Sequence, residues 1–426
     1  MKQWLKKNVI SPAWWGMKKL PPAAALIDYR TNKFFDEWMP SIYCRYTQRP
    51  VDEKKVVLVE NQPAGLGSAF TLLYQDLKKD GEYRVHIHHI GNGLLPKKQW
   101  EKNCAEMVAD IATARYVFLS EASGAVSCLP LRDETVVTQL WHGCGAFKKF
   151  GRSTADAKFG LDRQHADRHP LYQNYSYVTV SSPEVVWAYA EAMGLEERKE
   201  VIRPVGVSRT DVFFRKDYLS NAPERVYRIV PQARGKRIIL YAPTFRGRIA
   251  LASSPDYQQF DLLRLREKLG DEAIILIKHH PNVREARIPK LPEDLEGRFA
   301  VDVTKDLEID DLMCAADVCI TDYSSLIFEY SLLDKPLVFY TYDLDEYGDW
   351  RGFYYDFSEL TPGPVCRNME ELAECLPSVQ QSYDRERMQA FRDKFMRSCD
   401  GHSTRRIEEM VFGRSLNPED SYGMEI

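Results

Sequence analysis

The sequence predicts an α/β fold with two Rossmann-like domains, each built on a doubly wound parallel sheet. Apolar runs of strand length alternate with amphipathic, helix-like segments, which is the pattern of βαβ units. Two such series are present, one from about residue 50 to 208 and one from residue 236 onward. The 426 residues, 44 % hydrophobic and 28 % charged, suffice for two or three domains. Two such domains leave a cleft, and open α/β sheets bind ligands at the carboxyl ends of their strands.

Composition excludes several classes of function. The net charge of −4 and the isoelectric point of about 6.2 argue against a nucleic-acid binder driven by overall charge. The nine cysteines contain no CxxC pair, and their odd number fits a reduced, cytoplasmic compartment better than a disulfide framework or a zinc site. No apolar run approaches the roughly 20 residues of a transmembrane helix, and PPAAALI is too short for a signal-peptide core.

An N-terminal arm, residues 1 to 49, precedes the first sheet. Its first 27 residues contain five lysines and no acidic residue, interleaved with three tryptophans. This composition suits an interfacial segment on an anionic membrane surface, and the alternative is an arm packed on the domain. Pro12 interrupts any single helix here, and Pro21 and Pro22 end it. We expect this arm to contact the membrane.

The first series contains one feature that resembles a metal site. Its strands are expected at 55–60, 83–90, 115–121, 135–143, 175–182 and 199–206, and its helices at 70–79, 106–114 and 183–194. Gly65 and Gly67 lack the GxGxxG spacing and are expected to form a turn. Alternation places His86 and His88 on one face of their strand and His89 on the other. Because no acidic or cysteine partner is expected nearby, we predict no metal at these histidines.

The second series begins after residues 207 to 235, which lack clear periodicity and are expected to contain the domain boundary. Its strands are expected at 236–243, 273–281, 299–303, 317–322 and 337–342, and its helices at 260–270, 311–316, 326–333 and within 368–413. The predicted domains are therefore residues 50–215 and 216–426. No internal sequence repeat is present.

The stretch TDYSSLIFEYSLLDKP, residues 321–336, joins a buried strand to a helix through a turn with two hydroxyl groups. Ser324 and Ser325 lie where the helix begins, and Lys335 and Pro336 end it. Free backbone N–H groups, the helix dipole and serine hydroxyls together can hold a phosphate. The alternative is that Ser324 is only the N-cap of the helix.

Another strand end carries a candidate base. In QLWHGCGAFKK, His142 comes at the end of an apolar strand and has Gly143 and Gly145 close by in sequence. These glycines allow close approach of a ligand. A histidine here can act as a general base, and the alternative is a buried, hydrogen-bonded histidine beside a core tryptophan. Lys148 and Lys149 either face an anionic acceptor or are solvated.

Two more strand ends offer groups for an anion. In YAPTFRG, Arg246 can grip a phosphate with two hydrogen bonds and Thr244 adds a donor. In LIKHHP, Lys278, His279 and His280 precede a proline, and alternation does not decide which histidine faces the cleft.

The acidic stretch after the last strand is less specific. Asp343, Asp345, Asp349 and Arg351 could order a loop or contact a donor, and a solvated acidic loop explains them equally well. No DxD motif joins the stretches above, so no required divalent metal is indicated. The residues taken by themselves indicate a two-domain enzyme with phosphate-holding groups in its C-terminal half and one candidate base in each half.

Seven stretches in order resemble the CDP-glycerol glycerophosphotransferase family of teichoic acid synthesis. They are WHGCGAFKKFG, GVSRTDVFF, YAPTFRG, KHHP, TDYSSLIFEY with DKPLVFY, the D…Y…RG loop and DGHSTRR at 400–406, and they lie within roughly residues 50 to 410. The resemblance implies the GT-B fold, with an acceptor-side domain at 50–215 and a CDP-polyol-binding domain at 216–426. It implies that CDP-glycerol donates glycerol phosphate to a hydroxyl of a lipid-linked saccharide, with release of CMP, at the cytoplasmic face of the membrane.

The resemblance also implies residue roles. His142 and His280 match the family's essential histidines, and His279 occupies the variable position. Ser324 and Ser325 match the serines that contact the donor's phosphates. The other residues expected on the donor side are Thr244, Arg246, Lys278, Thr321 and Asp322, and those on the acceptor side are Gly143 and Lys148. No cofactor, metal or nucleic acid is implied.

The chain departs from the family at two positions. Glu329 stands where Asp is frequent, and Ser208 stands where Pro is frequent before Arg209. Neither is expected to touch the chemistry. The chain lacks the large N-terminal extension of some polymerases, which leaves a short priming enzyme, or a transferase of a capsular or other wall polymer, as further alternatives. The alternatives are a CDP-ribitol donor, a GT-B glycosyltransferase that uses a nucleotide sugar, and a non-catalytic membrane scaffold.

In the implied reaction the acceptor hydroxyl must lose its proton as it reaches the β-phosphorus. We expect His142 to take that proton. Arg246, the N–H groups of Ser324 and Ser325, and His280 are expected to offset the charge that builds on the bridging oxygens.

Overall fold

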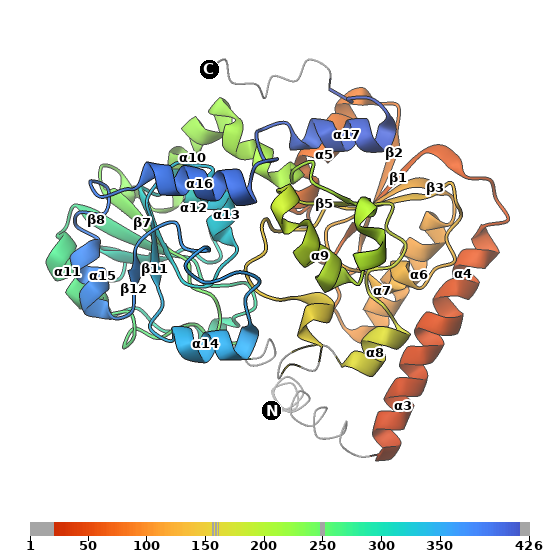
Figure 1. Ribbon diagram of the computed structural model, residues 1–426, viewed down its shortest axis with the longest axis horizontal. Helices are drawn as coiled ribbons and strands as arrows, with labels where there is room; N and C mark the ends of the chain where they lie inside the picture. The colour runs from red at the N-terminus through yellow and green to blue at the C-terminus, as the bar shows by residue number, and fades with distance from the viewer. Residues whose placement is uncertain (1–20, 156, 158–159, 161, 248–251, 418–426) are drawn as a thin grey trace. The chain divides into compact units, whose positions relative to one another are not determined.

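The computed structural model describes residues 21–155, 157, 160, 162–247 and 252–417 and consists of helices around two parallel sheets (Figure 1). The elements up to the middle of the chain are α3 (Pro21–Asn32), the π-helix η1 (Lys33–Trp38), α4 (Met39–Tyr46), β1 (Asp52–Glu60), α5 (Ser68–Asp80), β2 (Arg84–His89), α6 (Lys97–Ile111), β3 (Ala114–Leu119), α7 (Gly124–Ser127), β4 (Val136–Gln139), η2 (Gly151–Thr154), α8 (Arg163–Arg168), β5 (Tyr177–Thr179), η3 (Pro183–Val185), α9 (Val186–Met193), η4 (Glu196–Val201), β6 (Ile202–Arg203) and η5 (Ser208–Phe214).

The remaining elements belong to the second sheet and the C-terminal helices. They are α10 (Lys216–Ile229), η6 (Pro231–Ala233), β7 (Arg237–Tyr241), α11 (Leu262–Leu269), β8 (Ala273–Ile277), η8 (Glu285–Arg287), β9 (Ala300–Asp302), α12 (Ile309–Ala315), β10 (Val318–Thr321), α13 (Leu326–Ser331), β11 (Leu337–Tyr340), α14 (Leu344–Arg351), β12 (Val365–Cys366), α15 (Met369–Cys375), α16 (Arg385–Phe395) and α17 (Ser403–Phe412).

The described residues fall into two compact units. Unit 1 comprises those within Met1–Gly67, Gly81–Gln139 and Gln164–Ser176, and unit 2 comprises those within Ser68–Asp80, Leu140–Arg163 and Tyr177–Ile426. Unit 2 contains the whole second sheet and also the segment that carries His142. The assignment of residues 50–215 to the acceptor and 216–426 to the donor stays a prediction.

The six-stranded sheets have the orders β2-β1-β3-β4-β5-β6 and β12-β11-β10-β7-β8-β9. Within unit 1, β1 pairs in parallel with β2 and β3, and β3 pairs in parallel with β4. The apolar run from Val56 to Val59 is at most 2 % exposed, as expected for a parallel strand covered on both faces. The predicted α/β class with two parallel sheets is confirmed.

The second sheet lies inside unit 2 and is centred on β10, which pairs in parallel with β7 and β11. All of β8, from Ala273 to Ile277, is buried. Helices α11 and α15 cover one face, where Leu265 and Leu372 pack with the strand residues in a single core cluster. This packing fixes the carboxyl ends of β7, β8 and β10, which carry the YAPTFRG, KHHP and DYSS stretches.

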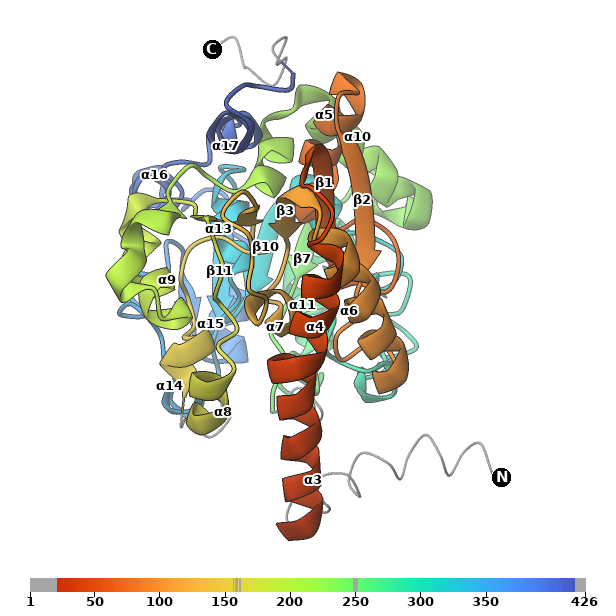
Figure 2. The ribbon, with the colours of Figure 1, turned by 90° about the vertical axis from the view of Figure 1, so that its right-hand side faces the viewer.

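The arm is helical where the structure describes it, which the sequence did not lead us to expect. Helix α3 begins at the prolines that were expected to end a helix, because proline is well tolerated in a first turn. Figure 1 shows α3, η1 and α4 following one another as a single rod, and Figure 2 shows the same rod from the side. Phe34, Met39 and Tyr43 are buried, whereas Leu26 and Tyr29 are exposed. The lysine- and tryptophan-rich residues 1–20 lie outside the described residues.

Three further expectations need correction. Residues 216–229, expected to lack regular structure, form α10, which continues through Pro223 because Ala222 and Val226 are buried along one side. The strand expected at 199–206 is only β6, since Glu196–Val201 forms 3₁₀ turns. The acidic stretch after β11 is not a loop, because Leu344–Arg351 forms α14.

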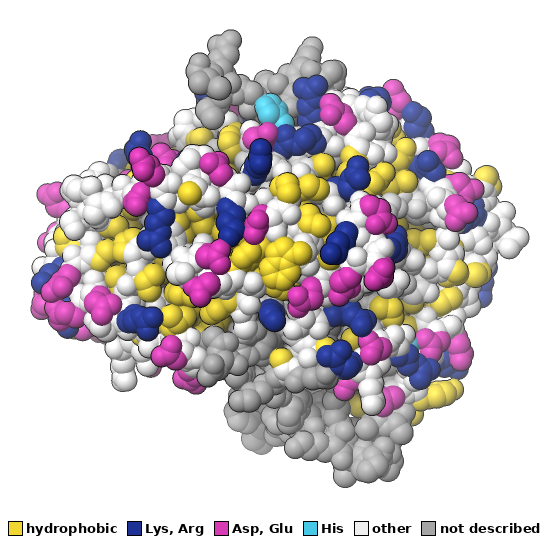
Figure 3. Space-filling view, viewed as in Figure 1, with side chains coloured by type: hydrophobic (Ala, Val, Ile, Leu, Met, Phe, Trp, Pro, Cys, Tyr) yellow, Lys and Arg dark blue, Asp and Glu magenta, His cyan; other side chains and the backbone are white. Residues whose placement is uncertain are grey.

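Surface charge is mixed on the face shown in Figure 3, where Lys and Arg side chains alternate with Asp and Glu. This arrangement agrees with the absence of a strongly basic composition. Within residues 21–417, apart from the short undescribed gaps, no helix has both the length and the apolar character needed to cross a bilayer.

Candidate active site

The loop that carries His142 has an unusual backbone. Trp141 adopts left-handed angles with a φ of 60°, a conformation that costs a non-glycine residue about 1–2 kcal/mol. The indole ring lies against the imidazole of His142, with ring centres 4.6 Å apart and planes inclined by 25°. Phe150 also packs against the indole, with ring centres 5.3 Å apart. His142 itself is exposed, so the alternative of a buried structural histidine is wrong.

Glycines bring this loop into contact with α13. A Cβ atom at Gly145 would lie 2.3 Å from Phe328, so only glycine fits there, and its φ is 61°. A Cβ atom at Gly143 would lie 3.8 Å from Oγ of Ser325. Unit 2 therefore places the candidate base loop directly beside one of the serines of the DYSS turn.

A buried arginine links the same two elements. Nη1 of Arg209 donates to the carbonyl of His142 at 2.9 Å and lies 3.3 Å from Oε1 of Glu329. Nη2 of Arg209 donates to Oδ1 of Asp310 at 2.6 Å. Glu329 belongs to α13 and Asp310 to α12. The expectation that Glu329 does not touch the chemistry stays a prediction, but its carboxylate is linked to the backbone of His142 through Arg209, which the sequence did not lead us to expect.

The carboxyl group of Glu329 is fully buried. Burial raises its pKa above the usual range, although the positive charge of Arg209 acts in the opposite direction. Oε2 of Glu329 has no hydrogen-bond partner among the described residues. The thiol of Cys144, in the His142 loop, also has its pKa raised by burial, by a hydrogen bond with Cys399 and by the charge of Glu329. These groups are therefore largely removed from water, and an unpaired charge among them would be costly.

The DYSS turn differs in detail from its prediction. The N-cap residue of α13 is Ser325, whose side chain makes no capping hydrogen bond, and the hydroxyl of Ser324 accepts from the N–H of Leu326 at 3.3 Å. Ser325 is exposed. Helix α13 ends at Ser331, two residues before the predicted end, and its six residues make only a small dipole. The role of Ser324 and Ser325 in holding a phosphate stays a prediction, and it would depend on the two hydroxyls more than on the dipole of this short helix.

The strand end before this turn is held by buried hydrogen bonds. Oγ1 of Thr321 donates to the carbonyl of Ala242 at 2.7 Å. Oδ1 of Asp322 accepts from the N–H of Thr244 at 2.9 Å and from the N–H of Tyr323 at 2.7 Å. Thr321 and Asp322 thus join the carboxyl end of β10 to the YAPTFRG stretch. Both are at most 3 % exposed.

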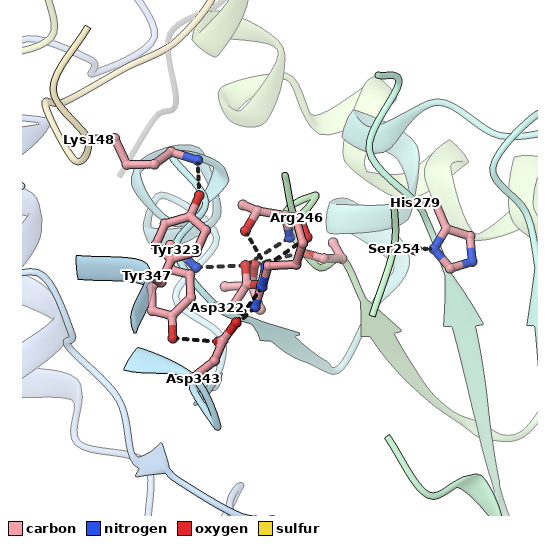
Figure 4. Close-up of polar contacts among 11 residues, drawn as sticks. Lys148, Arg246, Ser254, His279, Asp322, Tyr323, Asp343 and Tyr347 are labelled. Atoms are coloured by element: carbon pink, nitrogen blue, oxygen red, sulfur yellow. Dashed lines mark hydrogen bonds and ion pairs between the residues drawn. The ribbon is translucent and has the colours of Figure 1, made fainter. Parts of the chain in front are cut away.

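Arg246 lies at the centre of a charged and aromatic cluster, shown in Figure 4. Its guanidinium donates to Oδ2 of Asp322 at 2.9 Å and makes two hydrogen bonds with the carboxylate of Asp343, at 2.6 and 3.0 Å. The rings of Tyr323 and Tyr347 lie 5.3 and 5.0 Å from the guanidinium carbon. Burial lowers the pKa of Arg246, but the two carboxylates outweigh burial and hold it far above the usual range.

Lys148 reaches this cluster from the His142 loop. In Figure 4 its side chain extends to Tyr347, whose hydroxyl accepts from Nζ at 3.3 Å. The backbone of Lys148 forms an isolated antiparallel bridge with Phe353, and the N–H of Lys149 donates to the carbonyl of Gly352 at 3.1 Å. The loop is thereby tied to the segment after α14. The Asp349 and Arg351 side chains lie outside the described residues.

The three polar residues of the KHHP stretch, Lys278, His279 and His280, lie in different surroundings. Nζ of Lys278 donates to the carbonyls of Thr304 and Leu307 at 2.7 and 2.5 Å, and burial lowers its pKa. His279 is 1 % exposed, and its Nδ1 lies 2.5 Å from the hydroxyl of Ser254, apart from the Arg246 cluster in Figure 4. Burial lowers the pKa of His279.

His280 is the more accessible of the two neighbouring histidines. Its Nδ1 accepts from the N–H of Asn282 at 3.1 Å, and its ring packs edge-on against Phe245 at 4.8 Å. The imidazole is half-buried, and Nδ1 is already used as an acceptor. The contrast with buried His279 agrees with the choice of His280 as the candidate site histidine, whose role stays a prediction.

The three histidines of β2 belong to unit 1, and one expectation about them is wrong. An acidic partner is present, because Oδ2 of Asp110 lies 2.8 Å from Nδ1 of His86 and 2.8 Å from Nε2 of His88. Nζ of Lys55 bonds the other oxygen of Asp110. The helix prediction at 106–114 contained Asp110, but the sequence did not show that α6 packs this residue against β2. No group in the described part of the chain has the geometry of a metal site.

The sequence analysis assigned no role to Arg209 and Asp310, two residues that organise the candidate site. Asp343 was considered as a residue that orders a loop or contacts a donor, but its pairing with Arg246 was not expected. Each acts through a partner that lies 67 to 120 positions away in the sequence, as Arg209 with His142 and with Glu329. The position of Arg209 in GVSRTDVFF, directly after β6, was the one signal that could have identified it.

Comparison with known proteins gives the family. The family model described as CDP-Glycerol:Poly(glycerophosphate) glycerophosphotransferase matches residues 41–413. The teichoic acid ribitol-phosphate primase of Bacillus spizizenii is 34 % identical over 365 residues, which are 85 % of this chain and 92 % of that protein. The teichoic acid glycerol-phosphate primase of Bacillus subtilis is 29 % identical over 291 residues, 67 % of this chain and 70 % of that protein.

Solved structures agree on the fold. The wall teichoic acid polymerase TagF, as a histidine-to-asparagine variant soaked with CDPG, superposes with a TM-score of 0.72 at 22 % identity and covers 93 % of this chain and 96 % of that one. This likeness confirms the predicted GT-B architecture. Because the family model matches most of the chain, this protein belongs to the CDP-glycerol:poly(glycerophosphate) glycerophosphotransferase family of teichoic acid transferases.

Proposed function

We propose that this protein transfers a polyol phosphate from a CDP-polyol to a hydroxyl group of a lipid-linked saccharide acceptor, and that CMP is released. The observation that carries the proposal is the contact of the His142 loop with the DYSS turn, where Gly143 lies beside the exposed hydroxyl of Ser325. A proton acceptor and a phosphate-binding hydroxyl in one compact unit are the two groups that phosphoryl transfer to an alcohol requires.

The residues act by positioning and by moving one proton. The acceptor oxygen forms a bond to the β-phosphorus, the bond from that phosphorus to the CMP oxygen breaks, and Nδ1 or Nε2 of His142 receives the hydroxyl proton. Ser324 and Ser325 hold the phosphate oxygens, and His280 offsets the charge on the leaving group. Arg246 has its guanidinium bound to Asp322 and Asp343, so we assign it the task of holding the DYSS strand end.

The donor is the open choice within this reaction. CDP-ribitol is favoured by the relative that matches at 34 % identity over nearly its full length, a ribitol-phosphate primase. The CDP-glycerol expected from the sequence is favoured by the family description and by the glycerol-phosphate primases. We propose CDP-ribitol as the first candidate donor and CDP-glycerol as the second.

A donor panel tests the proposal. The purified protein is incubated with CDP-ribitol, CDP-glycerol or UDP-N-acetylglucosamine and a synthetic lipid-linked disaccharide that carries terminal glycerol phosphate. Release of CMP and a product heavier by one or more polyol phosphates, seen by mass spectrometry, support the proposal and identify the donor. Release of UDP with glycosylated product would instead support the glycosyltransferase alternative. No turnover of any donor, with the protein folded, would leave only the non-catalytic alternative.

We further propose that the protein acts at the cytoplasmic face of the membrane and is held there peripherally. Residues 1 to 27 are basic and contain no acidic residue. Leu26 and Tyr29 on α3 are 52 and 60 % exposed, and exposed apolar side chains in a chain segment that follows a basic stretch suit an anionic lipid surface.

Vesicle flotation tests this location. The full chain, a chain without residues 1–20, and the double variant Leu26→Ser with Tyr29→Ser are compared on vesicles of phosphatidylglycerol and on vesicles of phosphatidylcholine. We expect the full chain to bind the anionic vesicles and both altered chains to bind less. Equal partition of all three chains would refute the anchor.

A further inference from the structure

We propose that Arg209 is a positioning residue for His142, and that Glu329 and Asp310 fix Arg209 for that task. The inference rests on the proposed function, because it assigns a role within the same site. It adds a residue that neither touches the reacting atoms nor was expected to take part. Arg209 acts through the backbone of His142, so it is distinct from the base and from the donor-binding serines.

The first observation is the set of hydrogen bonds around the guanidinium. One nitrogen, Nη1, donates to the carbonyl oxygen of His142 at 2.9 Å. The carboxylates lie at 2.6 Å for Asp310 and 3.3 Å for Glu329. The side chains are 12 % exposed for Arg209, 12 % for Asp310 and 3 % for Glu329. A planar guanidinium held on two sides by buried carboxylates has one orientation, so the bond to His142 has a fixed direction.

The second observation is the backbone that this bond restrains. Trp141 holds left-handed angles that a tryptophan rarely adopts, and its indole stacks on the imidazole of His142. A backbone of this kind persists only where the surrounding contacts determine it completely. The bond from Arg209 to the carbonyl of His142 is such a contact, because it restrains the peptide between His142 and Gly143 and with it the backbone that carries the imidazole.

The third observation is that Arg209 joins His142 to the helix of the DYSS turn. Glu329 lies four residues after Ser325, about one turn of an α-helix. Arg209 therefore spans from the candidate base to the helix that begins at the candidate phosphate-binding serine. Such a link fixes the distance between the proton acceptor and the phosphate. A displacement of either group by about 1 Å strongly lowers the reaction rate.

A second arginine pair in unit 2 provides a matched control. Nη2 of Arg225 lies 2.6 Å from Oδ1 of Asp311, the residue after Asp310 on the same helix, and its guanidinium lies over the ring of Tyr218. Arg225 therefore anchors α12 to α10 as Arg209 anchors it to η5. Among the described residues its polar contacts are with Tyr218 and Asp311, so its loss measures the purely structural effect of removing an arginine–aspartate pair from this helix.

The test combines kinetics with histidine resonances. Arg209→Lys, Arg209→Ala and Arg225→Ala are compared with the unchanged protein. We expect Arg209→Ala to lower kcat at least tenfold and to leave the donor KM within about threefold of the unchanged protein. The kcat of Arg209→Lys should lie between those of Arg209→Ala and the unchanged protein, and Arg225→Ala should keep the kcat of the unchanged protein. Added methylguanidinium should restore part of the turnover of Arg209→Ala and none of Arg225→Ala. Equal losses in Arg209→Ala and Arg225→Ala, without such rescue, would overturn the inference.

A second readout does not depend on the donor. The imidazole signals of His142 are assigned in histidine-labelled protein by their loss in His142→Gln. We expect them to move in Arg209→Lys and Arg209→Ala and to stay in place in Arg225→Ala. Unchanged signals in both Arg209 variants would refute the positioning role even if the protein uses no CDP-polyol. If instead the signals move but no donor is turned over, the proposed function fails and the positioning contact stands.

Discussion

The carboxylate of Asp343 binds the guanidinium of Arg246 through two hydrogen bonds, Nε to Oδ2 at 2.6 Å and Nη2 to Oδ1 at 3.0 Å, across 97 positions of sequence. Asp343 lies just after β11, and Arg246 follows β7. The pair closes a cluster with Asp322 and two tyrosine rings at the carboxyl ends of strands in one sheet. The pair therefore fixes the strand ends that form the floor of the candidate donor site.

The Asp343→Asn variant should be destabilised. Asp343 and Arg246 are 17 and 18 % exposed, and removal of one partner of a largely buried ion pair costs about 2–4 kcal/mol. Urea unfolding at pH 7 measures the effect on unit 2. Asp345→Asn is the control, because Asp345 is exposed on α14 and its loss should change the unfolding free energy by less than about 0.5 kcal/mol. Equal midpoints for the two variants would contradict the assignment.

The His142→Ala variant should lose at least about 100-fold in kcat while the donor still binds, because a general base contributes about 10²–10⁴-fold. Quenched time courses of CMP release give kcat, and isothermal titration calorimetry gives the affinity for the donor. His165→Ala is the control, since His165 is an exposed histidine of α8 in a different part of the chain. Near-normal turnover of His142→Ala would remove His142 from the mechanism.

The two serines of the DYSS turn should respond differently to loss of their hydroxyls. Ser325 is exposed and makes no capping hydrogen bond, so Ser325→Ala should weaken donor binding about tenfold with an unchanged melting temperature. The hydroxyl of Ser324 accepts from the N–H of Leu326, so Ser324→Ala should also lower stability by about 0.5–1 kcal/mol. Donor affinity and thermal unfolding are measured on the same samples. A loss of stability in Ser325→Ala without loss of affinity would reverse the assignment.

Asp110 should make folding stability depend on acid pH. Burial raises its pKa, but hydrogen bonds with His88 and Lys55 outweigh burial and hold the pKa well below the usual value. A carboxyl group whose pKa is lower in the folded protein stabilises the fold at pH values above its unfolded-state pKa of about 3.9. This contribution falls as the pH drops toward the folded-state pKa. Asp110→Asn should therefore be less stable by about 2 kcal/mol at pH 7, with a gap that narrows below about pH 4. A gap that is constant from pH 7 to pH 3.5 would contradict this origin.

Glu408 should make folding stability fall, rather than rise, as the pH increases toward neutral. Burial, together with the neighbouring carboxyl of Asp76, raises the pKa of Glu408 to about 8. The folded protein holds a proton that the unfolded chain loses above about pH 4.5, so stability falls as the pH rises from about 4.5 to 8. Glu408→Gln should remove this dependence and be more stable than the parent at pH 8.5, by on the order of 2 kcal/mol. Glu409→Gln, at an exposed position of α17, is the control. Parallel stability curves for Glu408→Gln and the parent would refute the raised pKa of Glu408 as the origin of this dependence.

The sequence predicted the parts of this protein that depend on local pattern. Buried strands such as β1 and β8 were placed to within a few residues, because continuous apolar runs identify strands covered on both faces. His142 and Ser325 were chosen as candidates because each follows a strand in a motif-like setting, and their roles stay predictions. The helix that contains Pro223 was missed, since proline normally breaks a helix and here the burial of Val226 outweighs that tendency.

The rest of the site depends on pairs that no local pattern contains. Arg209 and Asp310 are 101 positions apart, and His88 and Asp110 are 22 apart on different elements. Their partners are chosen by the packing of helices on sheets, which one sequence does not specify residue by residue. Glu329 was noted as a departure from the family, but its link to His142 became visible only when Arg209 was placed between them.

The left-handed backbone at Trp141 limits how this protein can be engineered for heat tolerance. A design procedure that gives every position the residue its backbone angles prefer would install glycine or asparagine there and relieve the strain. The same change would remove the indole that lies on the imidazole of His142. A variant library screened for thermal survival alone would therefore enrich molecules that are robust and slow, and selection for turnover has to accompany it at this position.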